Sequence, residues 1–163
     1  MTLTQERLKE VLDYKPNTGE FLWKIARRGK AKKGSIAGAN KTGGYRQIMI
    51  DGTMYQAHRL AWMYVYGKFP DDMIDHVNRQ PGDNSIANLR EATRKQNREN
   101  LGVPANNTSG FVGVYWVPSI RKWHAKIGHN KKRIHLGSFS AKDDAIHAVM
   151  CAKKQHFTHG SAF

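Results

Sequence analysis

Side chains that can bind a cation or take up a proton are concentrated between residues 73 and 100. Asp75 and His76 are adjacent and lie in a short apolar run. Asn88 follows His76 by 12 residues, and Asn97 follows Asp75 by 22 residues. Carboxylate and amide oxygens suit hard cations such as Mg²⁺, and imidazole suits proton transfer at neutral pH. This stretch could therefore combine one cation with one base.

The predicted elements explain how these residues could meet. A strand is expected around Asp75 and His76, followed by a loop. Thr93 and Gln96 have the spacing of a capping box, which places Asn97 in the first turn of a helix. That helix could bring Asn97 toward Asp75. Consecutive strand residues face opposite sides, so His76 can join the same site only at a strand end or a bulge.

The charge of the chain indicates a polyanionic partner. The 163 residues include 27 Lys and Arg against 13 Asp and Glu, a net charge of +14 with a pI near 10.1. An excess of this size is typical of proteins that bind nucleic acid. A DNA phosphate would also complete a Mg²⁺ site that has only two protein ligands. The sequence has no signal peptide, long apolar run or lipidation motif, which argues against a membrane partner.

Basic residues also form a glycine-rich run over residues 27–34. The run is either a solvated loop or a mobile arm that binds phosphates without reading sequence, and the pattern leaves both open. Its basic members are Arg27, Arg28, Lys30, Lys32 and Lys33. The single cysteine, Cys151, excludes an internal disulfide and a cysteine-rich zinc cluster, and we expect it to pack as a small apolar residue.

Local patterns predict four further elements before residue 70. Helices are expected over residues 4–12 and 59–66, a strand over residues 20–24, and a hairpin over residues 45–58. The hairpin prediction rests on Asp51-Gly52 between alternating apolar residues, since both positions of such a tight turn need positive φ. His58 lies where the hairpin meets the helix, and a buried structural role is favoured over a catalytic one.

The pattern of residues 55–62, 74–76, 84, 88–93 and 97 closely resembles the phage-type HNH homing endonucleases, which have a ββα-metal fold. The resemblance implies that His76 is the general base that activates water. It implies that Asp75 and Asn97 bind one Mg²⁺ or Mn²⁺ per active site, and that Asn88 braces the motif and orients the histidine. Residues 80–82 depart from the loop that relatives often have.

The C-terminal part predicts three antiparallel strands and a helix. The strands are expected over residues 110–117, 122–128 and 133–139, and the helix is expected after Ser140 as its N-cap, with Asp143 at the reciprocal position. Its apolar stripe comprises Ala145, Ile146, Ala148, Val149 and Ala152. This helix would cover one face of the sheet and leave a basic face open.

Gly113-Val114, the alternation of Trp123, Ala125 and Ile127, residues 136–139 and the alanine-rich helix resemble the AP2 DNA-binding domain over residues 108–163. In that family the sheet lies in the major groove. The resemblance implies DNA-facing positions at Tyr115, Val117, Lys126, Arg133 and His135, with Arg121 and His124 nearby. Several of these replace family arginines and a tryptophan, so we expect fewer bidentate contacts to guanine.

A zinc site is the alternative for the histidines of this part. The six residues concerned are histidines 124, 129, 135, 147, 156 and 159. Their spacing fits no familiar set of zinc ligands.

Together these patterns predict an α+β protein with two domains. Residues 1–100 would form the ββα-metal (HNH) nuclease domain with an N-terminal helix and hairpin, residues 101–109 a linker, and residues 110–163 the AP2-like domain. We expect a phage homing endonuclease that hydrolyses double-stranded DNA in the cytoplasm of the infected bacterial host. One such site cuts one strand, as in a nickase. A monomer is favoured, with the oligomeric state left open. The alternative is a non-catalytic, sequence-specific DNA-binding regulator.

Overall fold

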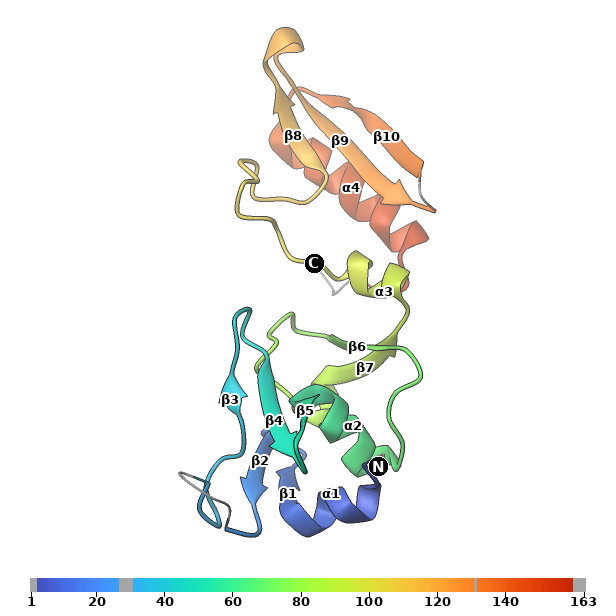
Figure 1. Ribbon diagram of the computed structural model, residues 1–163. Coiled ribbons are helices and arrows are strands. Elements are labelled where there is room, and N and C mark those ends of the chain that lie inside the picture. The colour runs from blue at the N-terminus through green and yellow to red at the C-terminus, as the bar shows by residue number, and fades with distance from the viewer. Residues whose placement is uncertain (1–2, 27–30, 131, 160–163) are drawn as a thin grey trace. The chain divides into compact units, whose positions relative to one another are not determined.

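The computed structural model describes residues 3–26, 31–130 and 132–159 of the chain, and within these ranges the elements form two units (Figure 1). The first unit is Met1–Asn97 and the second is Arg98–Phe163. The second unit thus includes residues 101–109, which have no helix or strand. Each unit has its own hydrophobic core. The architecture is mixed α and β, with small antiparallel sheets.

The first unit begins with a capped helix that packs on a two-stranded sheet. Its elements are α1 (Gln5–Val11), β1 (Leu12–Lys15) and β2 (Glu20–Trp23), and the strands pair antiparallel. The hydroxyl of Thr4 accepts a hydrogen bond from the Arg7 N–H at 3.2 Å, which satisfies one amide of the first turn. Leu8 and Val11 are fully buried on the inner side of α1, so this helix is held mainly by its apolar face.

The predicted hairpin is confirmed and leads directly into a helix. The elements are β3 (Ala39–Asn40), β4 (Arg46–Ile50), β5 (Thr53–Gln56) and α2 (Ala57–Tyr66). Asp51 and Gly52 have φ of 47° and 81°, as the tight turn requires. Helix α2 starts at Ala57, two residues earlier than expected, and ends where Gly67 takes a left-handed conformation. His58 therefore lies in the first turn of α2.

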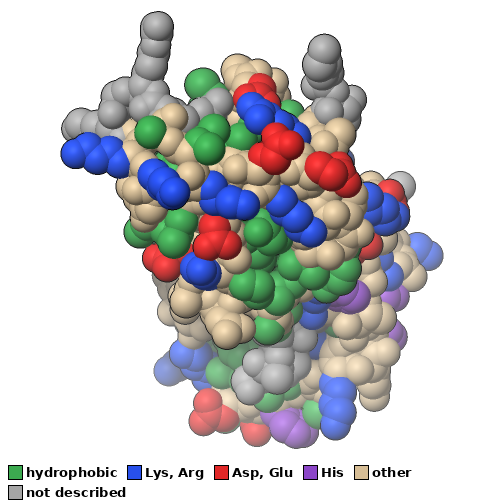
Figure 2. Space-filling view, turned by 90° about the horizontal axis from the view of Figure 1, so that it is seen from below, with side chains coloured by type: hydrophobic (Ala, Val, Ile, Leu, Met, Phe, Trp, Pro, Cys, Tyr) green, Lys and Arg blue, Asp and Glu red, His purple; other side chains and the backbone are tan. Residues whose placement is uncertain are grey.

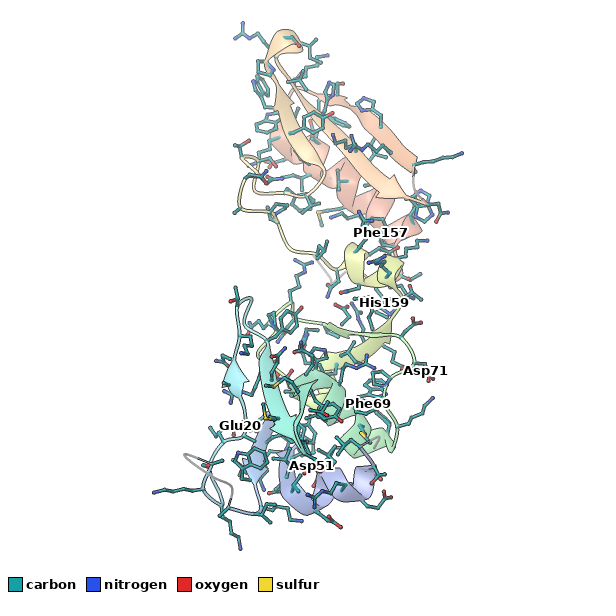
Figure 3. All side chains as sticks on the ribbon, viewed as in Figure 1. Glu20, Asp51, Phe69, Asp71, Phe157 and His159 are labelled. Atoms are coloured by element: carbon teal, nitrogen blue, oxygen red, sulfur yellow. The ribbon has the colours of Figure 1, made fainter. Side chains whose placement is uncertain are left out.

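An aromatic stack holds the segment between α2 and the next strand. The ring of Phe69, which is labelled in Figure 3, lies 5.9 Å from the ring of Tyr55, and the two rings are nearly parallel, at 9°. The guanidinium of Arg59 lies 5.8 Å from the centre of the Phe69 ring and donates to backbone carbonyls of the same segment. These contacts fix the direction in which the chain enters β6.

Two paired strands and a helix follow, whereas the residue pattern had predicted one strand, a loop and a helix. The elements are β6 (Met73–His76), the 3₁₀ turn η1 (Ile86–Asn88), β7 (Leu89–Ala92) and α3 (Arg94–Glu99). Strands β6 and β7 pair antiparallel, with Asp75 opposite Arg90 and His76 opposite Leu89. The capping box is confirmed, because the Gln96 N–H donates to Thr93 Oγ1 at 3.3 Å and the Thr93 N–H donates to Gln96 Oε1 at 2.8 Å.

The second unit is a three-stranded sheet covered on one face by a helix. Its elements are β8 (Val114–Val117), the 3₁₀ turn η2 (Pro118–Ile120), β9 (Lys122–His129), β10 (Lys132–Phe139) and α4 (Lys142–His156), and the strand order is β10-β9-β8. The apolar residues Val114, Ala125 and Ile127 pack against α4. Strand alternation then places Tyr115, His124 and Lys126 on the open face.

Three expectations for this unit were wrong. Strand β8 begins at Val114 instead of residue 110, because Gly110 and Gly113 have positive φ and interrupt the extended backbone. Ser140 does not cap α4, whose N-cap is Ala141 with no side-chain cap. Cys151 is exposed on α4, with its Sγ 3.7 Å from His147 Nε2, and so does not pack in the core.

Charges on the surface of the first unit are mixed where α1 lies. Acidic side chains stand among the lysine and arginine side chains on the face seen from below (Figure 2). The Arg7 guanidinium, for example, pairs with Asp51 at 2.9 Å and with Glu10 at 3.0 Å. No helix in the described ranges is both long enough and apolar enough to cross a membrane.

Candidate functional site

Strand β6 ends at His76, and its last two residues enter different surroundings. Asp75 pairs with Arg90 of β7, whereas the ring of His76 contacts Asn84 of the following loop. Both residues are 5% exposed. His76 thus lies at a strand end, one of the two arrangements that a shared site would require, and the two polar residues, which are adjacent in the chain, are both buried.

The ring of His76 is held by a buried amide. His76 Nε2 lies 3.2 Å from Asn84 Oδ1, and Asn84 is only 1% exposed. The hydroxyl of Tyr14 donates to the backbone carbonyl of Asn84 at 2.7 Å, which secures the position of that residue. When the amide oxygen accepts from Nε2–H, the lone pair that can take a proton is on His76 Nδ1.

Two further rings surround His76. The ring of His58 lies 5.3 Å from the ring of His76, edge to face, and Tyr45 lies 6.0 Å from His76 and 5.7 Å from His58. Burial, with smaller contributions from His76 and Arg59, lowers the pKa of His58 to about 4. His58 is therefore neutral at physiological pH. The sequence did not predict the contact between His58 and His76, although His58 lies within the first segment of the HNH-like pattern.

The carboxylate of Asp75 forms an ion pair with the guanidinium of Arg90. Arg90 Nη2 and Nε donate to Asp75 Oδ2 at 2.7 and 2.9 Å. The side chain of Asp75 is 6% exposed and that of Arg90 is 27% exposed. The two residues are a direct cross-strand pair, so the β6–β7 ladder sets their separation. Arg90 is a site residue that the sequence pattern contained but to which no role was assigned.

Asn97 lies on the same side of β6 as Asp75. Its Nδ2 is 4.0 Å from the sulfur of Met73, and Met73 precedes Asp75 by two residues and so faces the same side. Arg90 donates to one oxygen of Asp75, and carboxylate and amide oxygens are ligands that Mg²⁺ and Mn²⁺ accept. Asp75 and Asn97 therefore fit a divalent cation by their chemistry and by their common side.

Such a cation would need further ligands from outside the protein. Among the described residues, no three His, Cys, Asp or Glu side chains form a group that could hold a metal. The described histidines of the second unit are included in this statement. Mg²⁺ commonly keeps several waters and takes phosphate oxygens, so two protein ligands are compatible with it.

Asn88 braces the loop that carries Asn84. Its Oδ1 accepts from the Asn78 N–H at 2.9 Å, and its Nδ2 donates to the Asp83 carbonyl at 2.8 Å. The hydroxyl of Ser85 donates to the Asp83 carboxylate at 2.7 Å, and this bond is the main reason that the pKa of Asp83 is lowered. Asn88 thus acts on the loop, and Asn84 makes the contact with the ring of His76.

The turn between β1 and β2 packs against the loop that carries Asn84. The Pro16 carbonyl accepts from the Ile86 N–H at 2.9 Å. Gly19 has φ of 75°, and a Cβ at this position would lie 2.3 Å from the carbonyl carbon of Asn84. Only glycine allows this approach of two backbones. Part of the site therefore depends on a residue far away in the sequence.

The expected DNA-facing residues of the second unit lie on or beside the open face of its sheet. Lys126 Nζ is 4.1 Å from the centre of the Tyr115 ring, and the Tyr115 hydroxyl is 3.4 Å from His124 Nδ1. The ring of His135 lies 5.0 Å from that of His124. The remaining expected positions are Val117 in β8, Arg133 in β10 and Arg121 at the end of η2.

Only part of the basic run of the first unit can be placed. Lys32 and Lys33 are exposed beside a turn. Arg27, Arg28 and Lys30 lie outside the described residues.

Comparison with known proteins finds a family match that begins in β5 and includes the candidate site. The HNH endonuclease family matches residues 55–99, which run from β5 to α3. HNH nucleases are typically dependent on a divalent metal, and such a domain implies DNA as the substrate. Protein 3.8 of Escherichia phage T7 is 32% identical over 82 residues, which cover 50% of this chain and 68% of that protein. No solved structure matches. The chain therefore belongs to the same family as protein 3.8 of Escherichia phage T7, and its residues 55–99 form an HNH endonuclease domain.

Proposed function

We propose that the protein is a metal-dependent DNA endonuclease of the phage homing type, with His76 as its general base. The observation that carries this proposal is the pair of buried residues at the end of β6. Asn84 contacts the ring of His76, and the adjacent Asp75 forms an ion pair with the guanidinium of Arg90. A buried base beside a carboxylate that can bind a cation is the arrangement that phosphodiester hydrolysis needs.

His76 Nδ1 takes a proton from a water molecule, and the resulting hydroxide attacks the scissile phosphorus. A new P–O bond forms as the bond to the leaving 3′ oxygen breaks, and that oxygen takes a proton from solvent, which yields a 5′ phosphate and a 3′ hydroxyl. Asp75 and Asn97 would hold the divalent cation, Mg²⁺ or Mn²⁺. When bound, that cation stabilises the negative charge that develops on the leaving oxygen.

The surroundings of His76 suit a base that must be neutral before it acts. Because the pKa of His58 is lowered to about 4, this close neighbour carries no charge at neutral pH. A charged neighbour at this distance would repel the proton that His76 has to accept. Asn84 supports the same role, because it fixes which ring nitrogen carries the hydrogen.

The second unit supplies DNA binding in this proposal. Its open sheet face combines the cation of Lys126 with the rings of Tyr115, His124 and His135, and Arg133 extends the positive charge along β10. Lysine and arginine would contact phosphates, and the rings would contact base edges or sugars. The AP2-like resemblance of residues 108–163 is the reason for placing this face against the major groove.

A nicking assay on supercoiled plasmid tests the catalytic proposal. The wild-type protein should convert the plasmid to the nicked form, because one active site cuts one strand. This conversion should occur with Mg²⁺ or Mn²⁺ and not with EDTA. His76→Ala should reduce the rate by about 10²–10⁴ while DNA binding, measured by gel shift, stays unchanged.

The same assay separates the alternative of a non-catalytic DNA-binding regulator. In that case neither protein would nick the plasmid, although both would bind DNA. Equal nicking by His76→Ala would instead remove His76 from the proposed mechanism.

A further inference from the structure

Two hydrogen bonds from Arg90 converge on one oxygen of the expected metal ligand. Nη2 and Nε reach Asp75 Oδ2 at 2.7 and 2.9 Å. The pair lies on adjacent strands in direct register, and the carboxylate is almost fully buried, at 6% exposure of its side chain. A guanidinium therefore already pairs with one of the two oxygens that the carboxylate could offer to a metal cation.

We infer that Arg90 couples metal binding to DNA binding: it holds Asp75 in the free protein and yields that carboxylate to the cation when DNA phosphate is present. This inference rests on the proposed nuclease function. It adds a role for a residue that neither the sequence pattern nor the family match assigns.

The first argument is electrostatic. A divalent cation at Asp75 would lie within a few ångströms of the Arg90 guanidinium, and two like charges at that range repel each other. Burial of the carboxylate reduces screening by salt. The free protein should therefore bind the metal more weakly than Asp75 and Asn97 would allow without Arg90.

Arg90 also has the properties needed to bind a DNA phosphate after it leaves Asp75. The side chain of Arg90 is 27% exposed, in contrast to Asp75, so part of it lies at the surface that an incoming strand of DNA would meet. Its planar set of donors matches the oxygens of a phosphate as well as those of a carboxylate. The side chain can turn toward a phosphate without disturbing β7, because the backbone ladder holds Leu89–Ala92 in place.

The consequence is a site that is completed by its substrate. Phosphate supplies the negative charge that offsets the cation, and it also attracts the guanidinium away from Asp75. Metal and DNA should therefore bind cooperatively, and each should raise the affinity of the other by the same factor.

The test measures metal binding directly. In a His76→Ala background, which preserves the DNA, Mn²⁺ binding to the free protein is followed by electron paramagnetic resonance. Arg90→Gln should bind Mn²⁺ on the order of tenfold more tightly than its parent. Arg7→Gln is the matched control, since it removes the same charge from an exposed pair in the same unit, and it should leave Mn²⁺ affinity unchanged.

The coupling is measured with a fluorescent DNA duplex of random sequence at constant ionic strength. Mn²⁺ should strengthen DNA binding by the parent protein, and this effect should shrink by the factor that Arg90→Gln gains in Mn²⁺ affinity. Arg90→Lys keeps the charge but loses the fork, so it should show an intermediate gain. This variant keeps the test decisive if Arg90→Gln does not fold.

Unchanged or weaker Mn²⁺ binding by both Arg90 variants would overturn the inference and leave Arg90 as a support for Asp75. Failure of the proposed metal site would look different, because Asp75→Asn would then leave Mn²⁺ affinity at the parent value. The Asp75→Asn measurement therefore tells the two failures apart.

Discussion

The imidazole rings of His58 and His76 meet edge to face, with centroids 5.3 Å apart and planes at 84°. One ring comes from the first turn of α2 and the other from the end of β6. The hairpin and helix before residue 67 therefore form part of the wall of the site, beyond their role in the core. Burial and the neighbouring His76 and Arg59 keep His58 neutral at physiological pH.

The stability of the first unit should fall in mild acid because of His58. Its pKa is about 4 in the folded protein against 6.5 for an unperturbed ring, so between these values the unfolded chain binds a proton that the folded protein does not. The stabilisation is complete above pH 6.5 and is lost as the pH falls toward 4. At pH 5 the loss is about 2 kcal/mol.

Urea unfolding at two pH values checks this. His58→Phe has no ring that titrates, so its free energy of unfolding should lose about 2 kcal/mol less than the wild type between pH 7 and pH 5. If the variant lost as much stability as the wild type, the neutral, partly buried state of His58 would be contradicted.

Asn84→Ala should impair both folding and nicking. The substitution removes the amide at 3.2 Å from His76 Nε2 and leaves a buried ring nitrogen without this bond, which costs about 1–3 kcal/mol of stability. The nicking rate should fall about tenfold or more, because the ring and its tautomer are less well fixed. Asn40→Ala, on exposed β3 in the same unit, is the control and should behave as wild type in both assays.

Gly19→Ala and Gly52→Ala should differ sharply, although both residues have positive φ. Each substitution carries a backbone penalty of about 1 kcal/mol. Only Gly19 also brings a Cβ to 2.3 Å from the Asn84 backbone, whereas a Cβ at Gly52 meets nothing within 4 Å. Gly19→Ala should therefore lower the melting temperature further and reduce nicking, because it displaces the loop that holds His76. Equal effects of the two variants would exclude the close approach as the cause.

Lys126→Gln should weaken DNA binding by the second unit without altering its fold. Lys126 stands on the open sheet face over Tyr115, whereas Lys154 lies on α4, which covers the opposite face. The slope of log K against log salt should decrease in magnitude by about 1 for Lys126→Gln. Lys154→Gln removes the same charge and should leave the slope close to that of the wild type. Identical slopes for the two variants would place DNA elsewhere on the protein.

Elements with local causes could be predicted from the sequence. The Asp51-Gly52 turn and the Thr93–Gln96 capping box both follow from interactions within a few residues, and both are present. The predicted start of β8 was wrong because the prediction followed the apolar residues and did not allow for the positive φ of Gly110 and Gly113. The predicted N-cap of α4 was wrong because Ala141 occupies that position instead of Ser140.

The sequence by itself determined that the chain is basic and that an HNH-like set of Asp75, His76, Asn88 and Asn97 occurs with suitable spacing. Only the tertiary structure decided what surrounds that set. Gly19 supports Asn84, His58 lies against His76, and Arg90 holds Asp75. These contacts join segments that are far apart in the sequence, so local sequence patterns do not predict them. They arise because the hairpin, α2 and the β6–β7 ladder pack on a common core.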